Sequence, residues 1–77
     1  MRDRDRLAFF VRQGEAAYRR MYDATCLSDA TARYSDAKEA FHSAIGIAVR
    51  LEDEVAAGRL RQRLAEIKAV FRRQFPS

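Results

Sequence analysis

Residues 34–49 read YSDAKEAFHSAIGIAV, and the spacing of the apolar residues in this stretch determines the predicted fold. Apolar side chains recur at steps of three and four. Because each residue of an α-helix turns by about 100°, these side chains fall on one side of a helix. The stripe alternates large with small side chains, which lets neighbouring helices approach closely. We therefore expect the middle helix of a small all-α domain. The stripe consists of Tyr34, Ala37, Phe41, Ala44, Ile45 and Ala48.

Similar stripes on both sides of this stretch predict two further helices. The first covers about residues 4–25, and its apolar residues span an arc of roughly 140°, the width of a core-facing helix. The third covers about residues 53–74 and ends before Pro76, with basic residues in its last turn, where the helix dipole favours cations. The fold class is thus all-α, a three-helix up-down-up bundle with short connections. The first stripe contains Leu7, Phe10, Val11, Ala17, Tyr18, Met21 and Tyr22, and the third contains Leu60, Leu64, Ile67, Phe71 and Phe75.

The start of the middle helix has two candidate positions. Ser28 or Asp29 offers a side-chain oxygen to free backbone N–H groups, as an N-cap does. Ser35 or Asp36 is the rival N-cap, which would leave a longer connection before the helix. We prefer the early start, because Ala30 is in phase with the apolar stripe.

The junction between the second and third helices also leaves two alternatives. No Gly or Pro marks a break near Leu51, so one continuous helix over residues 29–74 is compatible with the sequence. The acidic residues 52–54, however, suit the first turn of a new helix. Two antiparallel helices would also bury their stripes within one chain. We therefore expect a break, with helices over residues 29–51 and 53–74.

Gly14 lies inside the apolar arc of the first helix. A glycine within a helix costs ~1 kcal/mol relative to alanine. Gly14 is either tolerated without a specific role or lets another backbone come close, and we favour the second interpretation.

The length of the chain limits its core. Its 77 residues make a single domain over residues 1–77, and such a chain buries only about 60% of its unfolded surface. Cys26 is the only cysteine and His42 the only histidine, so an intrachain disulfide and a Cys/His metal cage are excluded. Oligomerisation remains as a source of stability. We expect a homodimer, with candidate partner contacts at Phe9, Tyr22 and Phe75.

The charge distribution favours a mixed, solvated surface. The net charge is +4, with fifteen basic and eleven acidic residues interspersed. Arginine predominates among the cations and suits phosphate, so a nucleic-acid-binding accessory role is the alternative. The basic residues spread around the third helix, and Arg63 is spaced to pair with Glu66. The candidate phosphate contacts are Arg19, Arg20, Arg59, Arg63, Arg72 and Arg73.

The chain offers little for catalysis or metal binding. Glu39 and His42 form an E-x-x-H pair, as in di-iron bundles, but they project away from the apolar stripe, whereas ligands must point into the bundle. Cys26 lacks a nearby base and is expected to be a small, buried or half-buried apolar residue. No phosphate-binding loop or nucleophile elbow is present. We therefore expect no enzyme, no cofactor and no metal.

Two features concern the location of the protein. No run approaches the ~18 apolar residues of a membrane span, and the opening residues MRDRDR lack the apolar core of a signal peptide. We expect a cytoplasmic bacterial protein that does not contact membranes.

The pattern Tyr34-x-x-Ala37-x-x-x-Phe41-x-x-Ala44 resembles the second helix of a tetratricopeptide repeat. The preceding helix departs from that family at Thr25 and Ser28, so a peptide-binding groove is not carried over. The size and pattern also resemble three-helix microtubule-interacting-and-trafficking domains and small uncharacterised bacterial helical proteins. These resemblances imply helix-hairpin packing. The predicted function is a non-enzymatic protein–protein interaction module that self-associates.

Overall fold

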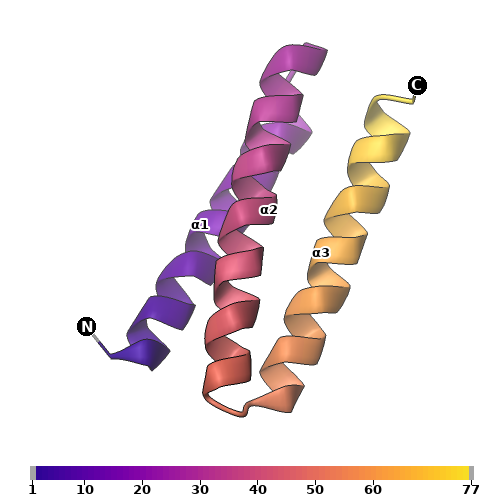
Figure 1. Cartoon of the computed structure of the whole chain (residues 1–77). Coiled ribbons are helices and arrows are strands. Elements are labelled where there is room, and N and C mark those ends of the chain that lie inside the picture. Colours follow the sequence, from indigo (N-terminus) through magenta and orange to yellow (C-terminus); the bar gives the residue numbers. More distant parts are fainter. Residues whose placement is uncertain (1, 77) are drawn as a thin grey trace.

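Three α-helices run up, down and up in a computed structural model of the protein, which describes residues 2–76 (Figure 1). They are α1 (Asp3–Asp23), α2 (Leu27–Arg50) and α3 (Glu54–Gln74), and the described residues contain no strand. The predicted all-α three-helix bundle is confirmed. Each predicted helix end lies within two residues of the observed one.

The middle helix α2 organises the packing. α1 packs closely along α2, whereas α3 packs on α2 less extensively and meets α1 least (Figure 1). Small buried side chains on α1 and α2, such as Ala17, Ala37 and Ala44, allow this close approach. The Cα atoms extend over 37 × 22 × 13 Å, so the molecule is flat. α1 and α3 flank α2 without closing fully on each other, which leaves grooves on both sides of α2.

The core confirms the predicted stripe and adds to it. Phe41 is fully buried, and so are the four alanines on the same face of α2, which are Ala30, Ala37, Ala44 and Ala48. Tyr34 and Ile45 are half-buried. Ile47 is also buried, although it lies off the predicted stripe, because the N-terminal half of α1 covers that side of α2. The buried residues form two clusters. One contains Ala17, Met21, Ala30, Ala37, Phe41, Leu64 and Ile67, and the other contains Leu7, Ala44, Ile47, Ala48 and Ala57.

The packing of the Phe41 ring requires a glycine at position 14. A Cβ atom added at Gly14 would lie 2.6 Å from Cε2 and 2.7 Å from Cδ2 of the Phe41 ring. Real Cβ contacts are not that short, so the missing side chain of Gly14 is the space that the ring occupies. The prediction of a close backbone approach at Gly14 is thus wrong in its partner, because the group that comes close is a side chain of α2.

The early start of α2 is confirmed, but its N-cap residue differs from the prediction. The helix begins at Leu27, and the N-cap residue Cys26 makes no side-chain cap hydrogen bond. Its backbone is extended, and its carbonyl accepts from the N–H of Ala30 at 3.1 Å. Neither Ser28 nor the later candidates at residues 35–36 caps the helix. Asp29 instead lies in the first turn, where a carboxylate stabilises the positive end of the helix dipole without being the cap.

The predicted break between α2 and α3 is confirmed, and it is made without glycine. Glu52 adopts φ of 57°, the left-handed region. The N–H groups of Glu52 and Asp53 donate to the carbonyls of Val49 and Ala48 at 3.0 and 2.9 Å, which is the Schellman pattern of a helix end. Asp53 then caps α3, because its Oδ1 accepts from the N–H of Ala56 at 3.0 Å.

We predict that Gly14→Ala destabilises the protein by about 1–3 kcal/mol, because the new methyl group must displace the Phe41 ring in a packed core. Chemical denaturation followed by circular dichroism measures this. Gly46→Ala and Gly58→Ala are matched controls, since a Cβ there meets nothing within 4 Å. Both are expected to stabilise by up to ~1 kcal/mol. A Gly14→Ala protein as stable as these controls would contradict the role of Gly14.

We predict that the Asp53 carboxylate makes the stability of the protein depend on pH in the acid range. The N–H of Ala56 and the guanidinium of Arg4, at 2.7 Å, lower the pKa of Asp53 below the ordinary 3.8. A lowered folded-state pKa contributes stability above the unfolded pKa, which is lost as the pH falls through the folded one. Asp53→Asn retains a capping side chain but not the charge. Its melting temperature should therefore decline less steeply than that of the wild type below about pH 4.

The variant Arg4→Gln tests the same pH dependence with a smaller expected effect, because it removes only one of the two groups that stabilise the Asp53 carboxylate. It should flatten the acid decline less than Asp53→Asn does. An Asp53→Asn protein with the wild-type decline would show that this carboxylate is not the source.

Candidate interaction surfaces

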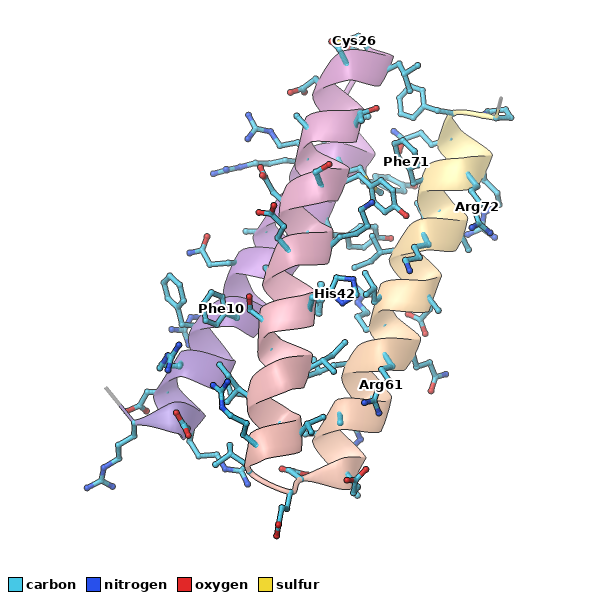
Figure 2. All side chains as sticks on the ribbon, viewed as in Figure 1. Phe10, Cys26, His42, Arg61, Phe71 and Arg72 are labelled. Atoms are coloured by element: carbon cyan, nitrogen blue, oxygen red, sulfur yellow. The ribbon has the colours of Figure 1, made fainter. Side chains whose placement is uncertain are left out.

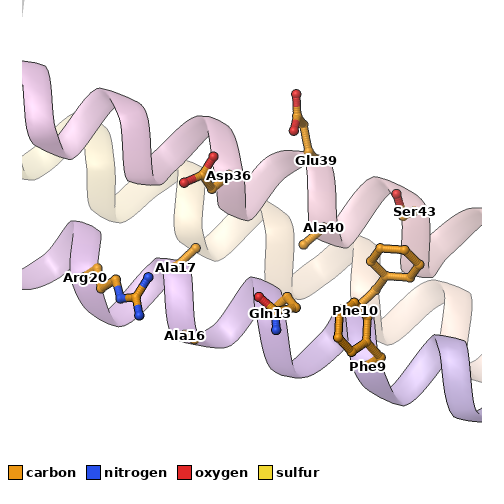
Figure 3. Close-up of a pocket in the computed structure, with 10 residues that line it drawn as sticks. All are labelled: Phe9, Phe10, Gln13, Ala16, Ala17, Arg20, Asp36, Glu39, Ala40 and Ser43. Atoms are coloured by element: carbon orange, nitrogen blue, oxygen red, sulfur yellow. The ribbon is translucent and has the colours of Figure 1, made fainter.

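A groove of about 490 Å³ runs between α1 and α2 on the side away from α3 (Figure 3). Ala17 and Ala40 point into the gap between the helices, and Phe9 and Phe10 lie at one end of it. The Phe9 ring packs edge-on against Phe10 at 5.3 Å but remains 41% exposed. We call this surface the α1–α2 groove. Its residues are Phe9, Phe10, Gln13, Ala16, Ala17, Arg20, Asp36, Glu39, Ala40 and Ser43.

Charges of both signs line the rest of the α1–α2 groove, with Arg20 and Asp36 at its far end and Glu39 near its middle. Arg20 stands on the α1 wall, and Asp36 and Glu39 stand on the α2 wall. Within the described residues, Arg20 takes part in no salt bridge, and Asp36 meets Arg33 of its own helix at 3.6 Å. One wall is thus cationic and the other anionic, and the two walls do not neutralise each other through a direct pair.

A second groove, of about 840 Å³, lies between the start of α2 and the end of α3. Its floor is aromatic, because the Tyr34 ring stacks on Phe71 with centroids 4.3 Å apart and Phe75 packs beside Phe71 at 5.9 Å. Lys38 holds its Nζ 4.5 Å from the centre of the Tyr34 ring. We call this surface the α2–α3 groove. Its residues are Leu27, Thr31, Tyr34, Ser35, Lys38, Phe71, Arg72, Gln74, Phe75 and Pro76.

The three predicted partner contacts lie on three different surfaces. Phe9 borders the α1–α2 groove. Tyr22, assigned to the core-facing arc of α1, is 62% exposed instead and borders a small depression with Val70 and Arg73 of α3. Phe75 is half-buried, packs against the larger core cluster and lines the α2–α3 groove. Sequence periodicity missed Leu27, Val49 and Val55, which are exposed as well, because they lie outside the stripes.

The predicted phosphate contacts do not gather into one patch. Arg20 and Arg72 belong to the two different grooves, and Arg73 lies beside Tyr22. Arg19 lies in the C-terminal half of α1 and Arg59 near the start of α3, which places them toward opposite ends of the bundle. All five guanidinium groups named here are on exposed residues. They are Arg19, Arg20, Arg59, Arg72 and Arg73.

Arg63, the sixth predicted phosphate contact, is occupied within the bundle. Its Nε and Nη2 donate to the two carboxylate oxygens of Glu15 at 2.8 and 3.1 Å, and its Nη1 donates to Glu66 at 3.1 Å. The guanidinium also lies 4.8 Å from the centre of the Tyr18 ring. The hydrogen bonds to Glu15 raise the pKa of Arg63. The predicted pair with Glu66 is present, and the main role of Arg63 is to connect α3 to α1, which share few other contacts.

The residues considered for metal binding or nucleophilic chemistry are dispersed. Glu39 and His42 are both exposed, and no group of three or more His, Cys, Asp or Glu side chains within residues 2–76 is arranged to hold a metal ion. Cys26 is exposed, not buried as expected, because it precedes the first turn of α2 at the end of the bundle (Figure 2). The N–H of Asp29 and the hydroxyl of Ser28 lower the pKa of its thiol.

None of the helices in the described part of the chain is long and apolar enough to cross a membrane. Comparisons with protein families, curated proteins and solved structures found no match to this chain. The resemblance of residues 34–44 to a tetratricopeptide-repeat helix therefore stays a prediction.

We predict that Glu15 and Arg63 are energetically coupled, because their contact is bidentate and joins two helices. A double-mutant cycle with Glu15→Gln and Arg63→Gln, measured by urea denaturation, should give a coupling energy of about 1 kcal/mol. Asp29 and Arg33 form the matched control, an exposed pair on one helix at 3.6 Å. Its cycle should give less than about 0.5 kcal/mol. Equal coupling in both cycles would contradict a clamp between α1 and α3.

Proposed function

We propose that this protein is a non-enzymatic helical interaction module that forms a homodimer through the α1–α2 groove. The observation that carries the proposal is the exposed ring of Phe9 beside a floor of small residues. A phenylalanine gives about 1.5–3 kcal/mol when it is fully buried, and 41% of Phe9 remains exposed in the single chain. The core of a 77-residue chain is small, so an additional apolar contact would contribute a large share of its stability.

The α1–α2 groove is self-complementary under one symmetry. In a dimer with its two-fold axis parallel to the groove, α1 of each copy lies over α2 of the other. Arg20 of one copy then faces Asp36 and Glu39 of its partner, and the reverse pair forms by symmetry. The four helices are antiparallel to their neighbours, as in a four-helix bundle. The alanines of the groove allow the two layers to approach closely.

A nucleic-acid-binding role is the second candidate. It is supported by the five exposed arginines among the predicted phosphate contacts, none of which takes part in a salt bridge within the described residues, and by the net charge of +4. Their dispersal over several surfaces weighs against it, because a phosphate backbone is tracked by cations on one face. Such binding would weaken steeply with added salt.

We predict that charge reversal separates and then restores the dimer. Sedimentation equilibrium should show a dimer for the wild type, and monomers for Arg20→Glu and for the double variant Asp36→Arg with Glu39→Arg. Each variant places like charges opposite each other in both symmetry-related contacts of the interface. An equimolar mixture of the two variants should form a heterodimer, because every facing pair is again of opposite sign.

A heterodimer would show that these charges meet across the two chains, because each variant alone stays monomeric and only the mixture dimerises. Val55→Glu is the control, since Val55 is 65% exposed but lies outside the groove at the start of α3. It should leave the dimer intact, whereas Phe9→Glu should dissociate it. A wild type that is monomeric at all concentrations would refute the proposed function. A dimer insensitive to Phe9→Glu and Arg20→Glu would refute the assigned interface.

A further inference from the structure

We propose that the α2–α3 groove is a docking site for an acidic amphipathic helix of a partner protein. This surface is separate from the α1–α2 groove, since it uses different residues of α2 and the opposite neighbouring helix. The proposed dimer leaves it uncovered. The inference therefore does not depend on self-association.

The shape of the groove suits a helix. Two antiparallel helices form its walls, and an amphipathic helix commonly binds in such a groove through residues spaced by three and four. The part of α2 that lines the groove spans residues 27–38, which is about 17 Å at 1.5 Å per residue and matches about three helical turns. A short helical segment would thus fill the groove.

The apolar content of the groove calls for apolar side chains on the partner. Leu27 is 56% exposed at the first turn of α2, although it is a large aliphatic residue. Phe75 and Pro76 continue the apolar surface at the other wall. The stacked rings of Tyr34 and Phe71 form a rigid floor between these walls. An apolar stripe on a docked helix would remove this surface from water.

The charges around the groove determine the sign of the partner. Among the ten lining residues, Lys38 and Arg72 are cations and none is an anion. Arg61, Lys68 and Arg72 follow one another at steps of seven and four, so they lie within about 40° of one another on α3 (Arg61 and Arg72 are labelled in Figure 2). Of these three, only Arg72 lines the groove, and Arg61 and Lys68 extend the same face of α3 toward its start, where Glu54 lies seven residues before Arg61. Glu39 does not line the α2–α3 groove, although with His42 it lines the adjoining depression on α2. A helix with Asp or Glu beside its apolar stripe complements these charges.

The aromatic residues favour a protein partner over a nucleic acid. In proteins that bind single-stranded nucleic acids, the bases stack on free faces of aromatic side chains. One face of the Tyr34 ring is covered by Phe71 at 4.3 Å, and Lys38 lies over the ring at 4.5 Å. The rings are thus engaged within the protein. A phosphate backbone would also leave Leu27 and Phe75 exposed to water, whereas an amphipathic helix would bury them.

Fluorescence anisotropy with labelled synthetic peptides tests the inference on the full-length protein. The probe is a short helical peptide with leucines at helical spacing and glutamates at the flanking positions. A matched peptide carries lysine in place of each glutamate, and a labelled single-stranded oligonucleotide serves as the third probe. The acidic peptide should bind at least about tenfold more tightly than the basic one.

Substitutions outside the core locate the binding. Leu27→Ser and the double variant Lys38→Glu with Arg72→Glu should each weaken binding of the acidic peptide about tenfold or more. Val55→Ser and Arg59→Glu are the matched controls, since both residues are exposed and lie outside the groove. They should change the affinity less than about twofold. Circular dichroism confirms that each variant is folded.

Three results would overturn the inference. They are equal affinity for the acidic and basic peptides, binding that the groove variants do not weaken, and oligonucleotide binding that the groove variants abolish while the acidic peptide does not bind. The monomeric Arg20→Glu variant should bind the peptide as the wild type does. Loss of peptide binding in that variant would show that the α2–α3 groove is not an independent site, whereas failure of dimerisation alone leaves the peptide result unaffected.

Discussion

The contact between the Phe41 ring and the space left by Gly14 is the constraint on which the rest of the structure depends. Phe41 is the largest fully buried side chain, and it points from α2 directly at the backbone of α1. A side chain of that size can be buried in a narrow interface only if the facing residue has no Cβ. The alanines along the same interface extend the close packing in both directions. α1 and α2 therefore form one tightly packed hairpin.

The third helix is attached by different means. α3 contributes large side chains such as Leu64 and Ile67 to the core, and these keep its backbone farther from α2 than small residues would. Polar contacts connect it to α1. They are the ion pair of Arg63 with Glu15, the hydrogen bond from Gln74 to the Tyr22 carbonyl at 2.9 Å, and the ion pair of Arg4 with the α3 N-cap Asp53 at 2.7 Å. A bundle of this kind stays flat and open at its edges. The grooves beside α2 follow from that arrangement.

Sequence periodicity predicts much of this fold and little of its surface. The stripe around Phe41 identifies α2, and the apolar arcs of the neighbouring segments identify α1 and α3. Gly14 was recognisable as unusual, but its partner was not, because helical spacing does not tell which side chain faces it across an interface. The break at Glu52 contains no glycine that would reveal it in the sequence. Hydrogen bonds to the carbonyls of Ala48 and Val49 stabilise the left-handed conformation of Glu52 instead. The sequence predicts the pair of Arg63 with Glu66 but not its contact with Glu15, which is distant in sequence.

The candidate sites required the tertiary structure for the same reason. Phe9 stands out in the sequence as an apolar residue off the stripe, yet its position at the Ser43 end of the α1–α2 groove, remote from Asp36, depends on the register of two helices. Leu27 reads as part of a connection, and only the early start of α2 turns it toward α3. In both grooves an apolar surface adjoins charged side chains. Apolar area alone would favour association with many partners, whereas the adjoining charges penalise a partner of the wrong sign. The two grooves differ in this respect, because one carries both signs on facing walls and the other carries cations only. The first arrangement complements a copy of itself, and the second repels one.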